Sequence, residues 1–150
     1  SRRSRPIATA LIGRPGVLVV MDAVAIDHLN LQIPADGTER ALEFYRDVLG
    51  FEIERLDAFE AGERPFFAVR LTPASVLHLW PDEAFEEPAG QNFDHFAIHL
   101  DATGEEIREL VENADVSVVD DRTVAGAQGD ARSIYVRDPF GYLLELKSRH

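Results

Sequence analysis

The feature of this sequence that most constrains its fold is an internal repeat with an offset of 67 residues. The segment "DHLNL" at 27–31 matches "DHFAI" at 94–98, so the offset carries His28 onto His95. The segments "VLHLW" and "LLELK" obey the same offset, which carries His78 onto Glu145. A repeat that carries its polar residues along indicates two copies of one structural unit in a chain of 150 residues.

Each half is predicted to hold one strand, one helix and three further strands. In the first half, polar and apolar residues alternate over 24–33, and apolar residues recur at helical spacing over 38–50. Three more strands are predicted at 51–58, 65–72 and 75–80. The proline- and glycine-containing segment 81–91 indicates a linker.

The second half repeats this order. A strand is predicted over 93–102, and Thr103 with Glu106 forms a capping box that opens a helix. Three strands follow at 116–124, 132–136 and 142–147. The expected fold class is therefore α+β, with two βαβββ modules at about 22–84 and 90–150 in a single domain, 22–150. Residues 1–21, which are rich in arginine, are expected to form a leader or an arm outside it.

Composition excludes several classes of protein. The chain has no cysteine, so disulfides, thiolate metal sites and cysteine nucleophiles are excluded. The net charge of −12 opposes binding to nucleic acid or to anionic lipid. No apolar run approaches the length that spans a bilayer. We expect a cytoplasmic protein that binds a small molecule and neither nucleic acid nor a membrane.

The four residues that the repeat pairs are candidate metal ligands: His28, His78, His95 and Glu145. Imidazole and carboxylate without thiolate suit one divalent ion such as Fe, Mn, Co, Ni or Zn. A single strand histidine is more often structural, but two equal offsets favour ligation. His78 is the least required, because three protein ligands already satisfy a catalytic site.

Other polar residues near the candidate ligands are interpreted as structural. His99 has Gln32 at its equivalent position, which favours a supporting role. Strand alternation predicts that Asp27 and Asp94 point away from the histidines that follow them. Tyr135 shares a strand face with Ser133 and is a candidate catalytic hydrogen-bond donor, although a half-buried structural tyrosine is the alternative.

Residues 22–148 resemble the vicinal oxygen chelate superfamily, which includes glyoxalase I, extradiol dioxygenases, fosfomycin-modifying transferases and bleomycin-resistance proteins. The resemblance rests on "IDHLNLQI", "ALEFYRDVLGFEI" and especially "RSIYVRDPFGYLLEL". It implies that the two modules form a cup-shaped mixed sheet with helices on the outer face. It also implies a divalent metal in the cup, with ligands from the first and fourth strands of each module, here His28, His78, His95 and Glu145.

The sequence departs from the pattern of three enzyme branches of that family. Glyoxalase I usually has a carboxylate at the position of His78, and that carboxylate acts as the base that abstracts a proton from the substrate. The extradiol dioxygenase signature includes an acid–base histidine where this chain has Gly126, Ala127 and Gln128. A basic cluster for a phosphonate, as in fosfomycin enzymes, is not identifiable.

The resulting prediction is a metal-dependent enzyme of the glyoxalase/extradiol dioxygenase type, acting on a small substrate through its vicinal oxygens. Lyase or isomerase chemistry and ring-cleaving dioxygenation both remain open. The alternative is a metal-free drug- or small-ligand-binding protein of the bleomycin-resistance kind. A homodimer is expected, because modules of such chains pair within one chain or by exchange between two.

Overall fold

A computed structural model describes residues 9–11, 18–90 and 92–149 of the chain. The first module contains β3 (His28–Pro34), α1 (Thr38–Ala41), which continues as the π-helix η1 (Leu42–Val48), β4 (Ile53–Glu54), α2 (Leu56–Glu60), β5 (Phe67–Thr72) and β6 (Ser75–Asp82). The second contains β7 (Phe96–Leu100), α3 (Gly104–Asn113), β8 (Val118–Val124), β9 (Ala131–Arg137) and β10 (Leu143–Ser148). The predicted α+β class and the two βαβββ modules are confirmed.

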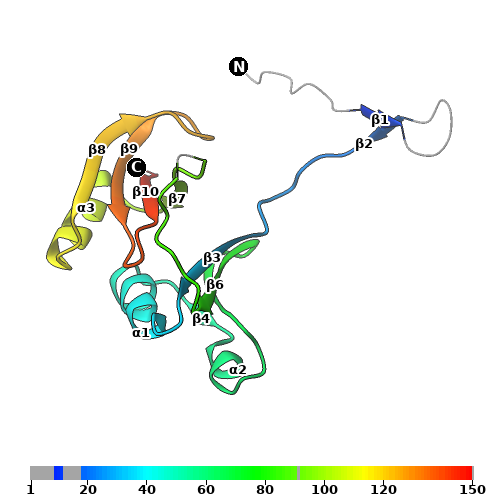
Figure 1. Cartoon of the computed structure of the whole chain (residues 1–150). Helices are drawn as coiled ribbons and strands as arrows, with labels where there is room; N and C mark the ends of the chain where they lie inside the picture. Colours follow the sequence, from blue (N-terminus) through cyan, green and yellow to red (C-terminus); the bar gives the residue numbers. More distant parts are fainter. Residues whose placement is uncertain (1–8, 12–17, 91, 150) are drawn as a thin grey trace.

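The two modules have the same sheet topology. The strand orders are β3-β6-β5-β4 and β7-β10-β9-β8, so each first strand lies beside the fourth strand of its own module. That pair is parallel, and the remaining neighbours are antiparallel. The two mixed sheets are separate and open, and the first strands β3 and β7 form an edge of each (Figure 1).

The repeat offset is preserved in the strand register. Asn30 pairs with His78 in the first module, and Ala97 pairs with Glu145 in the second. Asn30 and Ala97 are themselves repeat equivalents, two residues after His28 and His95. The 67-residue repeat therefore reproduces the placement of the polar residues as well as the order of the elements.

The core lies on one face of each sheet, and the candidate ligands lie on the other. In β10, Leu144 and Leu146 are fully buried in the core together with Ile107 and Val111 of α3. Because side chains alternate along a strand, Glu145 points to the opposite face. The Thr103–Glu106 capping box that opens α3 is present, as predicted.

The helix of the first module packs on the turn between β9 and β10 of the second. Tyr45 of η1 donates its hydroxyl proton to Asp138 at 2.7 Å, and both residues are buried. A Cβ at Gly37 would lie 2.8 Å from the ring of Phe140, so only glycine permits this approach. The modules are thus joined at the turn rather than through their polar sheet faces (Figure 1).

Two parts of the sequence prediction need correction or fall outside the described residues. The predicted strand 51–58 is wrong beyond Glu54, because Arg55 adopts a left-handed backbone (φ 63°) and the helix α2 follows. Within the expected leader, 1–21, the structure describes two short strands, β1 (Thr9–Leu11) and β2 (Leu18–Val20), and Met21. The two strands pair antiparallel. Residues 1–8 and 12–17 of the leader lie outside the described part. In the part of the chain that is described, no helix is long and apolar enough to cross a membrane.

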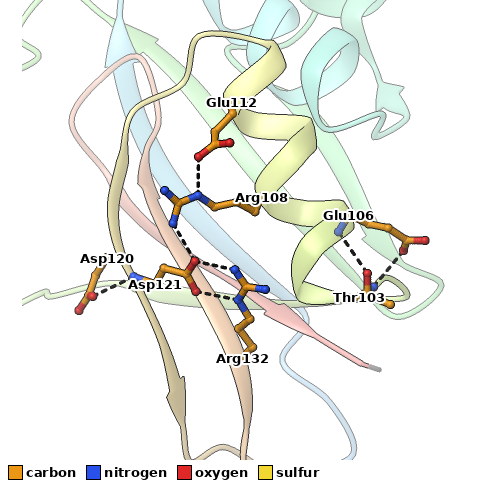
Figure 2. A network of polar contacts seen from close by, with 7 residues as sticks. All are labelled: Thr103, Glu106, Arg108, Glu112, Asp120, Asp121 and Arg132. Carbon is orange, nitrogen blue, oxygen red and sulfur yellow. Dashed lines mark hydrogen bonds and ion pairs between the residues drawn. The ribbon is translucent and has the colours of Figure 1, made fainter.

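A carboxylate on β8 ties α3 to sheet β7-β10-β9-β8. Asp121 accepts hydrogen bonds from Arg132 at 2.7 and 2.8 Å and from Arg108 at 2.7 Å (Figure 2). The hydrogen bonds from Arg132, followed by the one from Arg108, lower the pKa of Asp121 to about 2, against the effect of burial. These contacts hold the helix against β8 and β9.

Candidate metal centre

The second module brings His95 and Glu145 into direct contact. His95 immediately precedes β7, and its Nε2 lies 3.2 Å from Oε1 of Glu145 in the neighbouring strand β10. The Nδ1 of His95 donates its proton to the carboxylate of Asp94. In the neutral ring, Nε2 therefore presents a lone pair toward a carboxylate oxygen. A cation or a proton between these two acceptors would satisfy both.

Glu145 is a buried carboxylate with a fixed orientation. It is 5% exposed; Tyr135 donates to Oε1 at 2.6 Å and Ser133 to Oε2 at 3.1 Å. Burial raises the pKa of Glu145, but the hydrogen bonds from Tyr135 and Ser133 more than offset this, and the pKa lies below its ordinary value. Burial and the bond to Glu145 raise the pKa of Tyr135 to about 12. At neutral pH, Glu145 is ionised and Tyr135 is a proton donor.

The first module holds the equivalent pair, His28 and His78. Their rings stack with centroids 4.3 Å apart and an interplanar angle of 25°. The Nδ1 of His28 donates to Asp27 at 2.7 Å, as Nδ1 of His95 does to Asp94. Burial, followed by the adjacent His28, lowers the pKa of His78, which favours its neutral, ligating form.

A single chain does not bring the two pairs together. His28 contacts His78, and His95 contacts Glu145, but the pairs stand on separate sheets. Among the residues with described positions, no three His, Asp or Glu side chains are grouped closely enough to hold a metal ion. One chain thus carries two half sites, each with two potential ligands.

The predicted orientation of Asp27 and Asp94 is wrong. Both carboxylates hydrogen-bond to the histidines that follow them. The alternation argument fails because β3 begins at His28 and β7 at Phe96, so neither aspartate lies within a strand. A carboxylate bonded to Nδ1 fixes the ring orientation and makes Nε2 the free ligand atom.

Two other candidates occupy defined positions. The Nε2 of His99 donates to the backbone carbonyl of Ser148 at 3.2 Å, an interaction that fits a structural role. The hydroxyl of Tyr135 donates its hydrogen bond to Glu145, so Tyr135 contacts a candidate metal ligand. The catalytic role of Tyr135 stays a prediction.

Sequence reasoning missed several residues of these two faces. Ser133 holds the second oxygen of Glu145, and its position two residues before Tyr135 was the available signal. In the first module, Phe66 stacks on Trp80 at 4.8 Å and packs on His78 at 4.5 Å. Neither aromatic residue has a repeat equivalent of its own type, so the repeat could not identify them.

The family of the chain follows from its sequence and from this topology. Residues 25–146 match the Glyoxalase/Bleomycin resistance protein/Dioxygenase superfamily, and the chain belongs to that superfamily. The resemblance inferred from the sequence motifs is thereby confirmed. No curated protein matches the chain at a significant level.

Solved structures share the fold over nearly their whole length. An integron cassette protein from V. cholerae is 27% identical, with a TM-score of 0.67 over 88% of this chain and 100% of its own. A virulence protein from Salmonella typhimurium is 26% identical, with a TM-score of 0.66 over 85% and 98%. A glyoxalase/dioxygenase from Nostoc punctiforme, at 16% identity and a TM-score of 0.64 over 94% and 98%, shows the fold alone.

Proposed function

We propose that the protein is a divalent-metal-dependent enzyme of the glyoxalase/extradiol dioxygenase type, whose metal centre is completed between two copies of the chain. The observation that carries the proposal is the equivalent placement of the two half sites. Each places a histidine just before or at the start of its first strand, oriented by the preceding aspartate, beside a potential ligand on the fourth strand. The donors, imidazole and carboxylate, fit Fe, Mn, Co, Ni or Zn.

Dimerisation supplies what one chain lacks. The strands β3 and β7 are sheet edges, and the segments that lead into them expose apolar side chains: Val24 is 98% exposed, Ile26 74% and Phe93 44%. A twofold axis that sets β3 of one copy beside β7 of the other would bury these residues. It would also bring His28 and His78 of one copy to His95 and Glu145 of the other, and form two equal sites.

Each residue of the proposed site has a separate task. His28, His95 and Glu145 would hold the metal, with His78 as the fourth ligand. A metal in such a site supplies Lewis-acid stabilisation of charge that develops on substrate oxygens. Asp27 and Asp94 orient the histidine rings, and Ser133 with Tyr135 holds Glu145 ionised. Tyr135 is a positioning residue in this arrangement.

The sharpest test combines two double variants. His28→Ala/His78→Ala removes the ligands of the first module, and His95→Ala/Glu145→Ala removes those of the second. Each variant alone is expected to retain no metal after loading with Fe, Mn, Co, Ni or Zn and desalting. When the two are unfolded together, refolded and loaded, half of the dimers are mixed and one of their two sites is intact, so about a quarter of the wild-type metal content should return.

The outcomes separate the parts of the proposal. Metal in the wild type with none in the mixture would overturn the shared site and place all ligands in one chain. No metal in the wild type, whichever ion is offered, would overturn the enzyme proposal. The wild-type preference among the five ions indicates the reaction: iron with oxygen-dependent turnover favours dioxygenation, and nickel, cobalt or zinc with proton exchange favours lyase or isomerase chemistry.

One observation favours the second candidate, a metal-free protein that binds a flat drug or other small ligand. The rings of Trp80, Phe66, His78 and His28 contact one another in series on sheet β3-β6-β5-β4, stacked in two of the three contacts and tilted by 40° between Phe66 and His78. Such a surface suits an aromatic ligand. Binding of an aromatic drug by metal-free dimer, lost in Phe66→Ala, would support this candidate. The cytoplasmic location and the lack of nucleic-acid or membrane partners remain predictions from composition.

A further inference from the structure

The face of sheet β7-β10-β9-β8 that carries His95 and Glu145 also forms a pocket of about 360 Å³. Its other walls are the segment 125–128, which follows β8 and leads to β9, together with Ala97, His99 and Lys147. Three of the four residues in this segment are alanine or glycine, so the polar groups of the pocket come mainly from the sheet. The pocket is therefore adjacent to the candidate metal ligands and has imidazole and ammonium groups in its walls.

Lys147 places a buried positive charge in this pocket. It is the only lysine of the chain and lies two residues after Glu145, on the same face of β10. The side chain is buried (6% residue exposure), and its Nζ donates one hydrogen bond, to the backbone carbonyl of Val124 at 2.7 Å. Within the described residues, no carboxylate lies within 4.0 Å of this ammonium group.

An ammonium group has three N–H donors, and burying it without a counter-ion is costly. The carbonyl of Val124 uses one donor, and the described residues supply no hydrogen-bond partner for the other two. The negative charge of Glu145 interacts with Lys147, but the oxygens of Glu145 bond to Tyr135, Ser133 and His95 rather than to the ammonium group. The two remaining N–H donors are therefore open to a ligand in the pocket.

Gly126 permits the ammonium group to occupy this position. A Cβ at residue 126 would lie 2.8 Å from Cε and 2.9 Å from Nζ of Lys147. Any side chain there would displace the ammonium group from the pocket wall. The backbone of segment 125–128 thus lies in close contact with the ammonium group of Lys147.

We propose that Lys147 binds a carboxylate of the substrate, and that the substrate is a short-chain carboxylic acid. This proposal rests on the proposed function, since it assigns the pocket beside the metal ligands to the substrate. Residues i and i+2 of a strand are about 7 Å apart, which sets the carboxylate a few bonds from oxygens held near Glu145. A carboxylate fits better than a phosphate, which generally recruits several cationic or amide donors.

The test uses metal-free protein, so that it does not depend on the metal site. The full chain is treated with chelator and labelled with ¹⁵N, and backbone amide shifts are followed during titration with acetate. Acetamide, a neutral molecule of the same shape, serves as the matched probe. We expect saturable shifts at the amides of 125–128 and 146–148 with acetate and none with acetamide. Lys147→Met should abolish the shifts, and the control Arg149→Met, which removes a cation from an exposed site, should retain them.

Gly126→Ala is a second variant, which keeps the charge of Lys147 but displaces the ammonium group, and this displacement should weaken acetate binding. The second variant keeps the test decisive if Lys147→Met does not fold. Equal shifts with acetate and acetamide, or acetate binding that persists in both variants, would overturn the proposal and make Lys147 a structural clamp for 125–128. Acetate binding at Lys147 in a protein that takes up no metal would uphold this inference while the proposed enzyme function fails. Metal uptake without acetate binding would do the reverse.

Discussion

The hydroxyl of Tyr45 donates to the carboxylate of Asp138 at 2.7 Å across 93 residues of sequence, and this buried bond joins the helix of one module to the turn of the other. Asp138 also accepts hydrogen bonds from the backbone amides of Phe140 and Tyr142, each at 2.9 Å. Burial raises the pKa of Asp138, although these bonds oppose the rise. One carboxylate therefore shapes the turn that precedes β10 and anchors the first module to it.

Tyr45→Phe removes one donor from this buried carboxylate. We expect the free energy of unfolding to fall by about 1–3 kcal/mol, because Asp138 stays buried with one partner fewer. Urea denaturation followed by circular dichroism would measure the loss. The control is Tyr142→Phe, whose hydroxyl donates to the carbonyl of Gln32 from a less buried position and should matter less. Equal losses in the two variants would contradict the special role of the Tyr45–Asp138 bond.

The contribution of Asp121 to stability should depend on pH. Its pKa is about 2 in the folded chain, below the ordinary value of 3.8, so the folded state binds this proton more weakly than the unfolded state. The resulting stabilisation is present above pH 3.8 and disappears as the pH falls toward 2. Asp121→Asn should therefore destabilise the protein on the order of 1 kcal/mol at pH 7 and scarcely at pH 2.

Urea denaturation at a series of pH values would reveal this convergence. Asp120→Asn is the matched control, since Asp120 is its exposed neighbour and pairs only with Arg122 among the ion pairs of the described residues. A gap between wild type and Asp121→Asn that is independent of pH would refute the ionic explanation.

Tyr135→Phe should weaken metal binding without removing a ligand. The variant leaves Glu145 with one hydrogen bond fewer, so the pKa of Glu145 should rise and its orientation should loosen. Loss of such a supporting contact typically lowers metal affinity by about 10–100-fold. Competition with a chromophoric chelator would measure this, with Tyr142→Phe as the control that leaves Glu145 untouched. Unchanged affinity would reduce Tyr135 to a packing residue.

The two aspartates should have equivalent effects if the half sites meet. Asp27→Asn and Asp94→Asn each weaken the bond that orients a histidine, and we expect each to lower metal affinity by about 10-fold or more. Asp36→Asn, at an exposed position, is the control. An effect from Asp94→Asn alone would show that the first module contributes no ligand.

The sequence was informative wherever the repeat applied. The order of elements and the equivalence of His28 with His95 and of His78 with Glu145 follow from one offset. The separation of these residues into two contacts, His28–His78 and His95–Glu145, was not predicted. The prediction was wrong where local backbone geometry decides. Arg55 adopts a left-handed backbone conformation, which a sequence pattern usually signals by glycine, and here the residue is arginine. The strands β3 and β7 begin after Asp27 and Asp94, so the alternation of side chains within a strand does not apply to these aspartates. How the two modules lie relative to each other depends on Tyr45 and Asp138, which are unrelated in the repeat.

The buried position of Lys147 has a chemical consequence. Apart from its amino terminus, this chain offers amine-directed reagents a single target, and that target lies against Gly126 and within a pocket wall. Acylation of Lys147 requires the reagent to enter that pocket. Its rate, read by mass spectrometry as one added group per chain, therefore reports how accessible the pocket is and whether an occupant blocks it.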